Sequence, residues 1–279
     1  MVKKKDGRLE AVLVYIVLTF FALLILVPIV WGLSTSFKST GEVSRFPPSL
    51  IPDSLNLENF IKVLFHSNFS TYFGNSLLVT GICIVISTIV AGHAAYALAR
   101  FRIKHREQIM FAILMTGMVP AVALLIPLYI MFVRMGLYNT RIVLVLVYTA
   151  WRTPMLTWML KGFFESTPQA IEEAAMIDGS TRVQTFYQII VPISQPAISS
   201  SALLTAVYVW NDFLVSFTFV TKENLRTVSV GLYGYITQYG VQWGELMAAV
   251  MITIIPIIIL FVCLQRRFVD GMAAGAVKG

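Results

Sequence analysis

The sequence predicts an all-α integral membrane protein with about six transmembrane helices. Its 279 residues are 57% hydrophobic and only 13% charged, whereas a soluble domain usually carries about a quarter charged residues. Its longest charge-free stretches can each hold the roughly 20 apolar residues that cross a hydrocarbon core about 30 Å thick. These stretches are 11–37, 63–99, 108–133, 183–211 and 246–265.

The segments that cross the membrane must be helices. Backbone amides find no water in lipid, so only helices and closed barrels can cross it. Barrel strands alternate polar and apolar residues over about 10 positions, and these stretches do not alternate. We therefore expect helices near 11–33, 74–99, 108–133, 139–163, 196–219 and 244–265.

These helices divide the chain into three parts. Residues 1–73 hold the first transmembrane helix and an external loop, 74–265 form a core domain with five transmembrane helices, and 266–279 form a cytoplasmic tail. The first apolar stretch is longer than the core of a signal peptide, so we expect a retained helix. In the external loop, Asn56 is placed to cap a short amphipathic helix that lies against the membrane or a partner. The apolar positions of that helix are Leu57, Phe60, Ile61 and Leu64.

The distribution of Lys and Arg predicts the orientation. With a cytoplasmic N-terminus, 13 of the 21 basic residues fall in inner segments, 7 fall in outer segments, and Arg152 lies within the bilayer. Cytoplasmic loops carry the excess of positive charge, so both termini are expected in the cytoplasm. Because the basic residues flank apolar stretches, the net charge of +7 does not indicate a nucleic-acid partner. Cys83 and Cys263 lie inside predicted helices, where a disulfide framework or zinc site is not expected.

The connection at about 164–195 is predicted to be cytoplasmic and to contain two short helices. Thr167 can cap the first helix, with Pro168 at its first position, where a missing N–H costs nothing. Gly179 supplies the left-handed residue that ends this helix. Thr181 and Gln184 have the spacing of a capping box for the second helix. We expect that helix to run to Ile190 and to stop before Pro192.

This connection is also unusually acidic for a basic side of the membrane. Four of the chain's 14 acids lie in it, namely Glu165, Glu172, Glu173 and Asp178. Acids in first helical turns are favoured by the helix dipole, so the acids can be dipole compensation on a solvated face. They can equally form a docking surface for another protein. The residues alone leave both interpretations open.

The same connection resembles the EAA motif of binding-protein-dependent ABC transporter permeases. The similarity rests on Glu173-Ala174-Ala175, on Gly179, and on Ile189 with Pro192. Residues 126–129, 210–213 and 268–279 further resemble the carbohydrate-importer branch, in the manner of the smaller maltose-transporter permease subunit.

The resemblance implies a permease subunit, in a prokaryotic plasma membrane, for a small-molecule solute such as a sugar or oligosaccharide. The partners it implies are a second permease subunit, an ATPase dimer, an external solute-binding protein facing 221–243, and membrane lipid. The loop would then be a coupling loop, whose ATPase-docking residues are Glu172, Glu173, Ala174, Ala175, Asp178 and Gly179. No G-x-x-x-x-G-K-[ST] phosphate loop occurs in the sequence, so we expect no cofactor here, with ATP and Mg used by the partner ATPase.

Two charged residues are candidates for the translocation path. Arg152 lies at the middle of the fourth predicted helix, and Asp212 lies within the fifth. An ionisable group inside a membrane usually has a partner or faces a water-filled cavity. We therefore hypothesise a pair or shared network of Arg152 and Asp212. The alternatives are that Arg152 reaches the interface by snorkelling and that Asp212 caps local backbone near Asn211.

Two other function classes stay possible. A secondary transporter driven by an ion gradient usually shows several paired intramembrane acids, and here only Asp212 and Glu245 approach that pattern. A membrane-embedded enzyme would need a metal or nucleophile site, but the chain has three histidines and no H-E-x-x-H motif. An enzyme is therefore not expected.

Overall fold

The computed structural model describes the backbone of residues 7–238 and 240–276. By its internal contacts the chain forms two compact units, Met1–Ser70 with Leu232–Ile254, and Thr71–Gly231 with Ile255–Gly279. They are called unit 1 and unit 2 below. The predicted division at residues 73 and 265 concerns membrane topology and stays a prediction.

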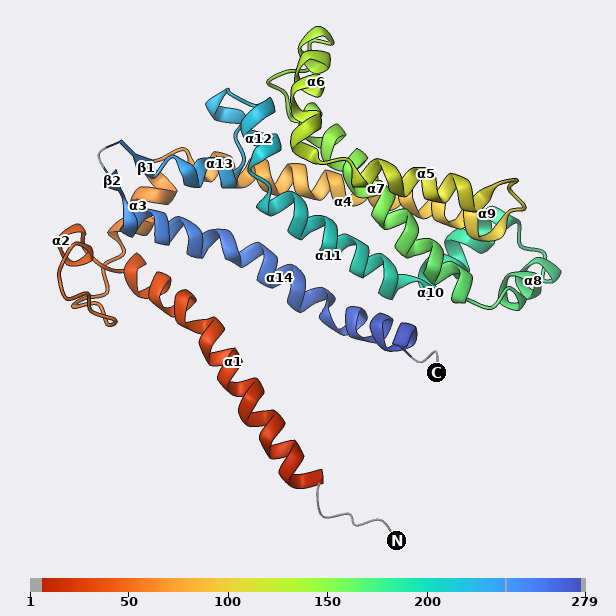
Figure 1. The fold of residues 1–279 in the computed structure, drawn as a ribbon, viewed down its shortest axis with the longest axis horizontal. Helices are drawn as coiled ribbons and strands as arrows, with labels where there is room; N and C mark the ends of the chain where they lie inside the picture. The colour runs from red at the N-terminus through yellow and green to blue at the C-terminus, as the bar shows by residue number, and fades with distance from the viewer. Residues whose placement is uncertain (1–6, 239, 277–279) are drawn as a thin grey trace. The chain divides into compact units, whose positions relative to one another are not determined.

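Unit 1 combines the N-terminal helices with a short hairpin and the start of the last helix (Figure 1). At Gly32 an added Cβ would lie 3.1 Å from Met251 Cε and 3.4 Å from Met247 Sδ, so the first and last helices pack closely there. Residues 10–31 of the first helix are exposed, which suits a surface covered by lipid or by another chain, whereas Ser34, Thr35 and Ser36 at its end are buried. The elements are α1 (Gly7–Ser36), α2 (Thr40–Val43), α3 (Glu58–Phe65), β1 (Ile236–Thr237), β2 (Gly240–Val241) and the first part of α14 (Trp243–Ala276), which continues into unit 2 from Ile255.

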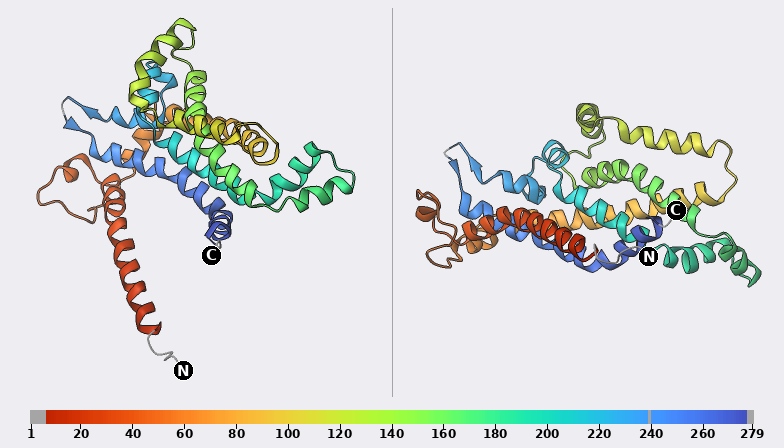
Figure 2. Two further views of the ribbon diagram at one scale, coloured as in Figure 1. Left: turned by 45° about the vertical axis from the view of Figure 1, so that its right-hand side comes forward. Right: turned by 60° about the horizontal axis from the view of Figure 1, so that its bottom comes forward.

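Unit 2 holds the remaining helices, of which α4, α7 and α11 lie side by side in both views of Figure 2. Two apolar clusters join these three helices. One is centred on Tyr148 and Phe219, and the other on Leu160 and Phe186. The elements are α4 (Phe69–Arg100), α5 (Arg106–Met118), α6 (Ala121–Arg134), α7 (Arg141–Ser166), α8 (Ala170–Ile177), α9 (Arg182–Thr185), η1 (Phe186–Ile190), α10 (Val191–Ile193), α11 (Gln195–Asn211), α12 (Leu214–Phe219), η2 (Glu223–Leu225) and α13 (Val228–Tyr233).

The prediction of an all-α membrane protein is confirmed, and the count of six spans depends on two bent pairs. Four helices of the described part are long and apolar enough to cross a membrane, and the number reaches six if each bent pair is one span. The helix expected at 108–133 is broken, since α5 and α6 meet at 88°. Pro120 explains this break: it lacks an N–H and holds Val119 in an extended conformation with ψ 126°.

The helix expected at 196–219 is also interrupted. The helix α11 ends at Asn211, Asp212 is extended with ψ 128°, and α12 starts at Leu214. The Asp212 carboxylate accepts a hydrogen bond from the Val215 N–H at 2.9 Å. This side-chain acceptor satisfies a backbone donor of a new helix and so favours the interruption.

The connection between α7 and α11 is helical, as predicted, but two of its boundaries differ. Thr167 does not cap the first short helix, because α7 continues to Ser166 and Thr167 ends it, with its Oγ1 3.2 Å from the Phe163 carbonyl. The Thr181–Gln184 capping box is present. The second helix does not stop before Pro192. The turn ahead of it, η1, is π-helical, with the Val191 N–H bonded to the Phe186 carbonyl, and such a wide turn leaves room for a proline ring.

Candidate functional site

The connecting loop between α7 and α11 places a two-helix elbow, α8 followed by α9, at the end of unit 2 where α4 and α7 also end (Figure 1). Gly179 sits at the bend with φ 92°, a conformation that L side chains rarely adopt. The Ser180 N–H donates to the Ala175 carbonyl at 3.0 Å and closes the turn. Hydrogen bonds at the bend therefore define the direction in which α9 leaves α8.

Glu172 attaches the elbow to the rest of unit 2 through buried contacts with α4. Its Oε1 lies 2.5 Å from Arg100 Nε, and its Oε2 accepts a hydrogen bond from the Tyr96 hydroxyl at 2.7 Å. Arg100 Nη2 also donates to the Thr167 carbonyl at 2.8 Å. The side chains of Arg100 and Glu172 are only 6% and 9% exposed. Glu172 therefore does not present its carboxylate to another protein, which corrects its expected place among the docking residues.

The outer surface of the elbow carries four of the other five predicted residues. Glu173, Ala174, Asp178 and Gly179 are exposed, whereas Ala175 is buried against the unit. The sequence reasoning missed the apolar part of this surface. Ile177 is 85% exposed at its tip, and Ile171, Met176 and Val183 are exposed as well. The presence of apolar residues in a loop predicted to lie on the basic, cytoplasmic side could have indicated this surface. A large exposed apolar patch commonly marks an interaction site.

The turn η1, directly after the elbow, is joined to α4 through aromatic rings. Phe186 of η1 packs against Tyr96, with ring centroids 4.6 Å apart. The Tyr187 hydroxyl lies 2.8 Å from His93 Nε2, and His93 Nδ1 lies 2.7 Å from the Ile89 carbonyl. The helix α8 and the turn η1, which follows α9, are thus both attached to the same helix, α4.

A second group of candidate residues forms two contacts between α7 and α11. Arg152 of α7 lies over the Tyr208 ring of α11, 4.6 Å from its centroid. The Tyr148 hydroxyl of α7 donates to Asp212 Oδ1 at 2.9 Å, just beyond the end of α11. Tyr148 and Arg152 are four residues apart on α7 and so share one face. Asp212 follows Tyr208 by four residues but lies just past the end of α11. The two contacts are therefore successive rungs between antiparallel helices.

The hypothesis of a direct Arg152–Asp212 pair is wrong for this structure, since no such ion pair occurs among the described residues. The alternative, in which Asp212 caps local backbone, is what the structure shows. Arg152 Nε is buried and has no hydrogen-bond partner in the described part of the chain. A buried guanidinium with an unpaired N–H is expected to bind a partner group or a polar solute.

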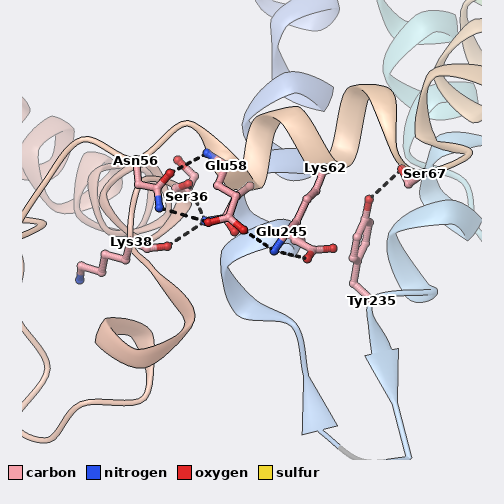
Figure 3. A network of polar contacts seen from close by, with 9 residues as sticks. Ser36, Lys38, Asn56, Glu58, Lys62, Ser67, Tyr235 and Glu245 are labelled. Atoms are coloured by element: carbon pink, nitrogen blue, oxygen red, sulfur yellow. Dashed lines mark hydrogen bonds and ion pairs between the residues drawn. The ribbon is translucent and has the colours of Figure 1, made fainter.

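Unit 1 contains a polar network around α3 (Figure 3). The Asn59 amide donates to the Ser36 and Lys38 carbonyls at 3.0 and 2.9 Å. Lys62 pairs with Glu58 at 2.8 Å, and this hydrogen bond lowers the pKa of Glu58 and raises the pKa of Lys62. The two Asn59 hydrogen bonds attach α3 to the end of α1, whereas the Lys62–Glu58 pair lies within α3.

The structure shows the predicted Asn56 cap of α3, but only part of the predicted apolar face of this helix is buried. Asn56 Oδ1 accepts from the Glu58 N–H at 2.8 Å. The helix buries Asn59 and Val63, while Ile61 and Leu64 stay exposed. Its contact with the membrane or a partner stays a prediction.

Long apolar helices, a stiff elbow held beyond their ends and polar rungs between two of them define a polytopic membrane protein. Residues 84–274 match the family described as binding-protein-dependent transport system inner membrane component. The chain belongs to this family, so it is a permease component of ABC importers and not their ATPase. The resemblance drawn from the EAA-like residues is thereby confirmed.

Individual relatives agree with this assignment over nearly the whole chain. The chain is 37% identical to a probable ABC transporter permease protein, YurM, of Bacillus subtilis, over 95% of this chain and 88% of that protein. It is 33% identical to the trehalose/maltose transport system permease protein MalG of Thermococcus litoralis, over 99% of both chains. A chain of a bacterial ABC transporter involved in the import of the acidic polysaccharide alginate superposes with a TM-score of 0.78 and 25% identity, covering 96% of this chain and 99% of that one.

Proposed function

We propose that the chain is the transmembrane permease subunit of an ATP-driven importer for a sugar or oligosaccharide. Its partners in this proposal are a second permease subunit, an ATPase dimer and an external solute-binding protein. The names of the relatives support the solute class, since one carries trehalose and maltose and a similar structure serves an acidic polysaccharide. The observation that carries the proposal is the elbow, which is rigidly attached inside and apolar and acidic outside.

The elbow is proposed to dock into the ATPase subunit. Ile177 supplies an apolar tip, and Glu173 and Asp178 supply carboxylates that can pair with basic groups on the partner. ATP and Mg²⁺ are then bound and used by that partner. Gly179 sets the bend, and Ala174 lets the partner approach closely.

The attachment of Glu172 to Arg100 explains how a displacement of the elbow reaches the membrane. Arg100 is the last residue of α4, so a movement of α8 pulls on the end of a 32-residue helix. Packed elements shift as discrete units rather than deforming continuously. The joint with η1 gives the movement a second contact with α4.

The proposed orientation places the elbow and both termini in the cytoplasm, in a prokaryotic plasma membrane. The excess of Lys and Arg in the segments assigned to that side supports it. The segment 221–243, with η2, α13 and the β1–β2 hairpin, then faces the external binding protein.

The rungs between α7 and α11 are proposed to line the translocation path. Arg152 lies near the middle of α7, which runs from residue 141 to 166. A guanidinium facing lipid there would cost about 2.5–3.5 kcal/mol on insertion scales. A path filled with water and polyhydroxylated solute, or the second permease, satisfies its donors instead. Asp212 stabilises the break between α11 and α12 beside this path.

The proposal is tested by two measurements on the complete importer reconstituted in vesicles, namely cross-linking and solute uptake. A cysteine in place of Ile177 is expected to cross-link to the ATPase subunit, whereas a cysteine in place of exposed Phe65 of unit 1 is not. Uptake that persists without the ATPase subunit would contradict the proposal and favour an ion-gradient transporter.

A further inference from the structure

Unit 1 contains a hollow of about 260 Å³ whose walls have an unusual chemistry. Two indole rings, of Trp31 and Trp243, line it together with Thr35, Lys38 and Glu42. The two residues are 41% and 51% exposed, so they are accessible. A small hollow with aromatic walls and a few polar groups is the usual form of a small-molecule site.

Lys38 is the most informative wall residue. Its side chain is buried, with the residue only 3% exposed, and in Figure 3 it extends away from the polar network around α3. Its Nζ donates to the Ser49 carbonyl and lies 5.1 Å from the centre of the Trp31 ring. Among the described residues it has no ion pair with an acid.

An ammonium group carries three donors, and burying one without acceptors is costly. The Ser49 carbonyl takes one of the donors of Lys38. The remaining donors are available to a molecule in the hollow that Lys38 lines. The site therefore favours a ligand rich in hydrogen-bond acceptors.

Glu42 supplies hydrogen-bond acceptors to the same hollow. Its Oε1 is held by the Asp53 N–H at 2.8 Å, which orients the carboxylate at the wall. Donor and acceptor groups thus stand beside two aromatic faces. A sugar ring matches this set, because its hydroxyls both donate and accept while its C–H face packs on an indole.

A second hollow adjoins the first. It has a volume of about 240 Å³, shares Val43 and Trp243 with the first, and is lined also by Asn59, Gln242 and Glu245. Glu245 adds a second carboxylate and Gln242 adds an amide, whereas the Asn59 amide already donates to the Ser36 and Lys38 carbonyls. Together the two volumes reach the range of about 300–1,000 Å³ typical of ligand sites.

We propose that the two hollows form a saccharide-binding site in unit 1, with neighbouring sugar units on either side of Trp243. It is distinct from the Arg152–Tyr208 rung in unit 2. The choice of sugar as ligand rests on the proposed function, while the site itself rests on the walls described above. Trp and Lys also occur where membrane proteins meet lipid headgroups. Glu42 and Glu245 disfavour that occupant, because their carboxylates repel a phosphate.

The test is tryptophan fluorescence of the purified permease–ATPase complex without the soluble binding protein. The probes are maltose, trehalose and an alginate oligosaccharide. We expect at least one to give a saturable change, with affinity at least tenfold weaker in Trp243→Ala and in Glu42→Gln. Trp243→Phe keeps an aromatic face and should lose less. Trp158→Ala, an exposed tryptophan of α7, is the matched control and should bind normally.

Three results would overturn the site. They are no response to any probe, equal weakening in the Trp158→Ala control, and a response to phosphatidylglycerol vesicles that the sugars do not displace. Glu42→Gln preserves shape, so a folding failure of Trp243→Ala does not decide the outcome. ATP-dependent uptake measured on the same variants separates the two proposals. If uptake persists while binding is absent, the site is wrong and the importer assignment stands.

Discussion

Glu172 Oε1 lies 2.5 Å from Arg100 Nε, and this buried contact joins the elbow to the end of α4 across 72 residues of sequence. It divides the acidic pair Glu172-Glu173 into two roles. Glu172 stabilises the elbow from inside, and Glu173 is free on its surface.

Replacing Arg100 by Ala is expected to destabilise unit 2 by about 3–5 kcal/mol, because it leaves the Glu172 carboxylate buried without its cation. Replacing both Arg100 and Glu172 by Ala should cost less than the sum of the single changes. Thermal unfolding of the purified protein in detergent measures both. Additive losses would contradict a direct pair.

Glu173→Ala is the surface counterpart of that change. We expect unfolding stability to stay within about 0.5 kcal/mol of wild type, because the side chain is exposed. Uptake by the reconstituted importer should fall, because a docking carboxylate is lost. Comparison with Glu172→Ala is the control, since that change should lower stability and uptake together. Full uptake in Glu173→Ala and in Ile177→Ser would argue against docking through this surface.

Gly179→Ala tests the bend. At φ 92° a Cβ costs roughly 1–2 kcal/mol, although no neighbouring atom lies within 4 Å of its position. The strain should shift the direction of α9 and reduce uptake without clashes. Gly162→Ala, also with open space but in a helix with ordinary φ, is the control and should be neutral or slightly stabilising. Normal uptake with Gly179→Ala would show that the bend tolerates another geometry.

The Arg152–Tyr208 contact gives a prediction for the transport path. Tyr208→Leu removes the ring beneath the guanidinium, a contact worth about 0.5–2 kcal/mol, whereas Tyr208→Phe keeps it. Uptake should fall in the first variant and be largely retained in the second. Exchanging the charges of Arg152 and Asp212 should not restore uptake, because the two side chains form no ion pair. A rescue by that exchange would contradict the two-rung arrangement.

Tyr235 gives a pH-dependent contribution in unit 1. Burial raises the pKa of its phenol, and the contact with Ser67 at 3.5 Å opposes that shift. A group whose folded pKa is raised stabilises the fold below its unfolded pKa of about 10 and loses this effect as the pH rises through the folded value. Protease resistance of the β1–β2 hairpin should therefore fall above pH about 10. Tyr235→Phe should lose this pH dependence, and an unchanged profile in that variant would assign it to another group.

Much of this protein follows from sequence alone. The membrane class follows from long uncharged stretches, because lipid offers no partner to backbone amides. The Thr181–Gln184 capping box and the left-handed Gly179 follow from contacts within a few residues, so local chemistry is sufficient. The EAA-like residues likewise located the elbow.

Only the tertiary structure decided which side chains of the elbow face inward. Glu172 and Glu173 are equivalent in sequence, and the packing of α8 against α4 separates them. The rungs between α7 and α11, and the hollow between Trp31 and Trp243, join residues far apart in the chain. Pro120 and Asp212 also interrupt helices that hydropathy treats as continuous. Hydropathy reports how far a segment is apolar, but the partner of a charge depends on which distant segment packs beside it.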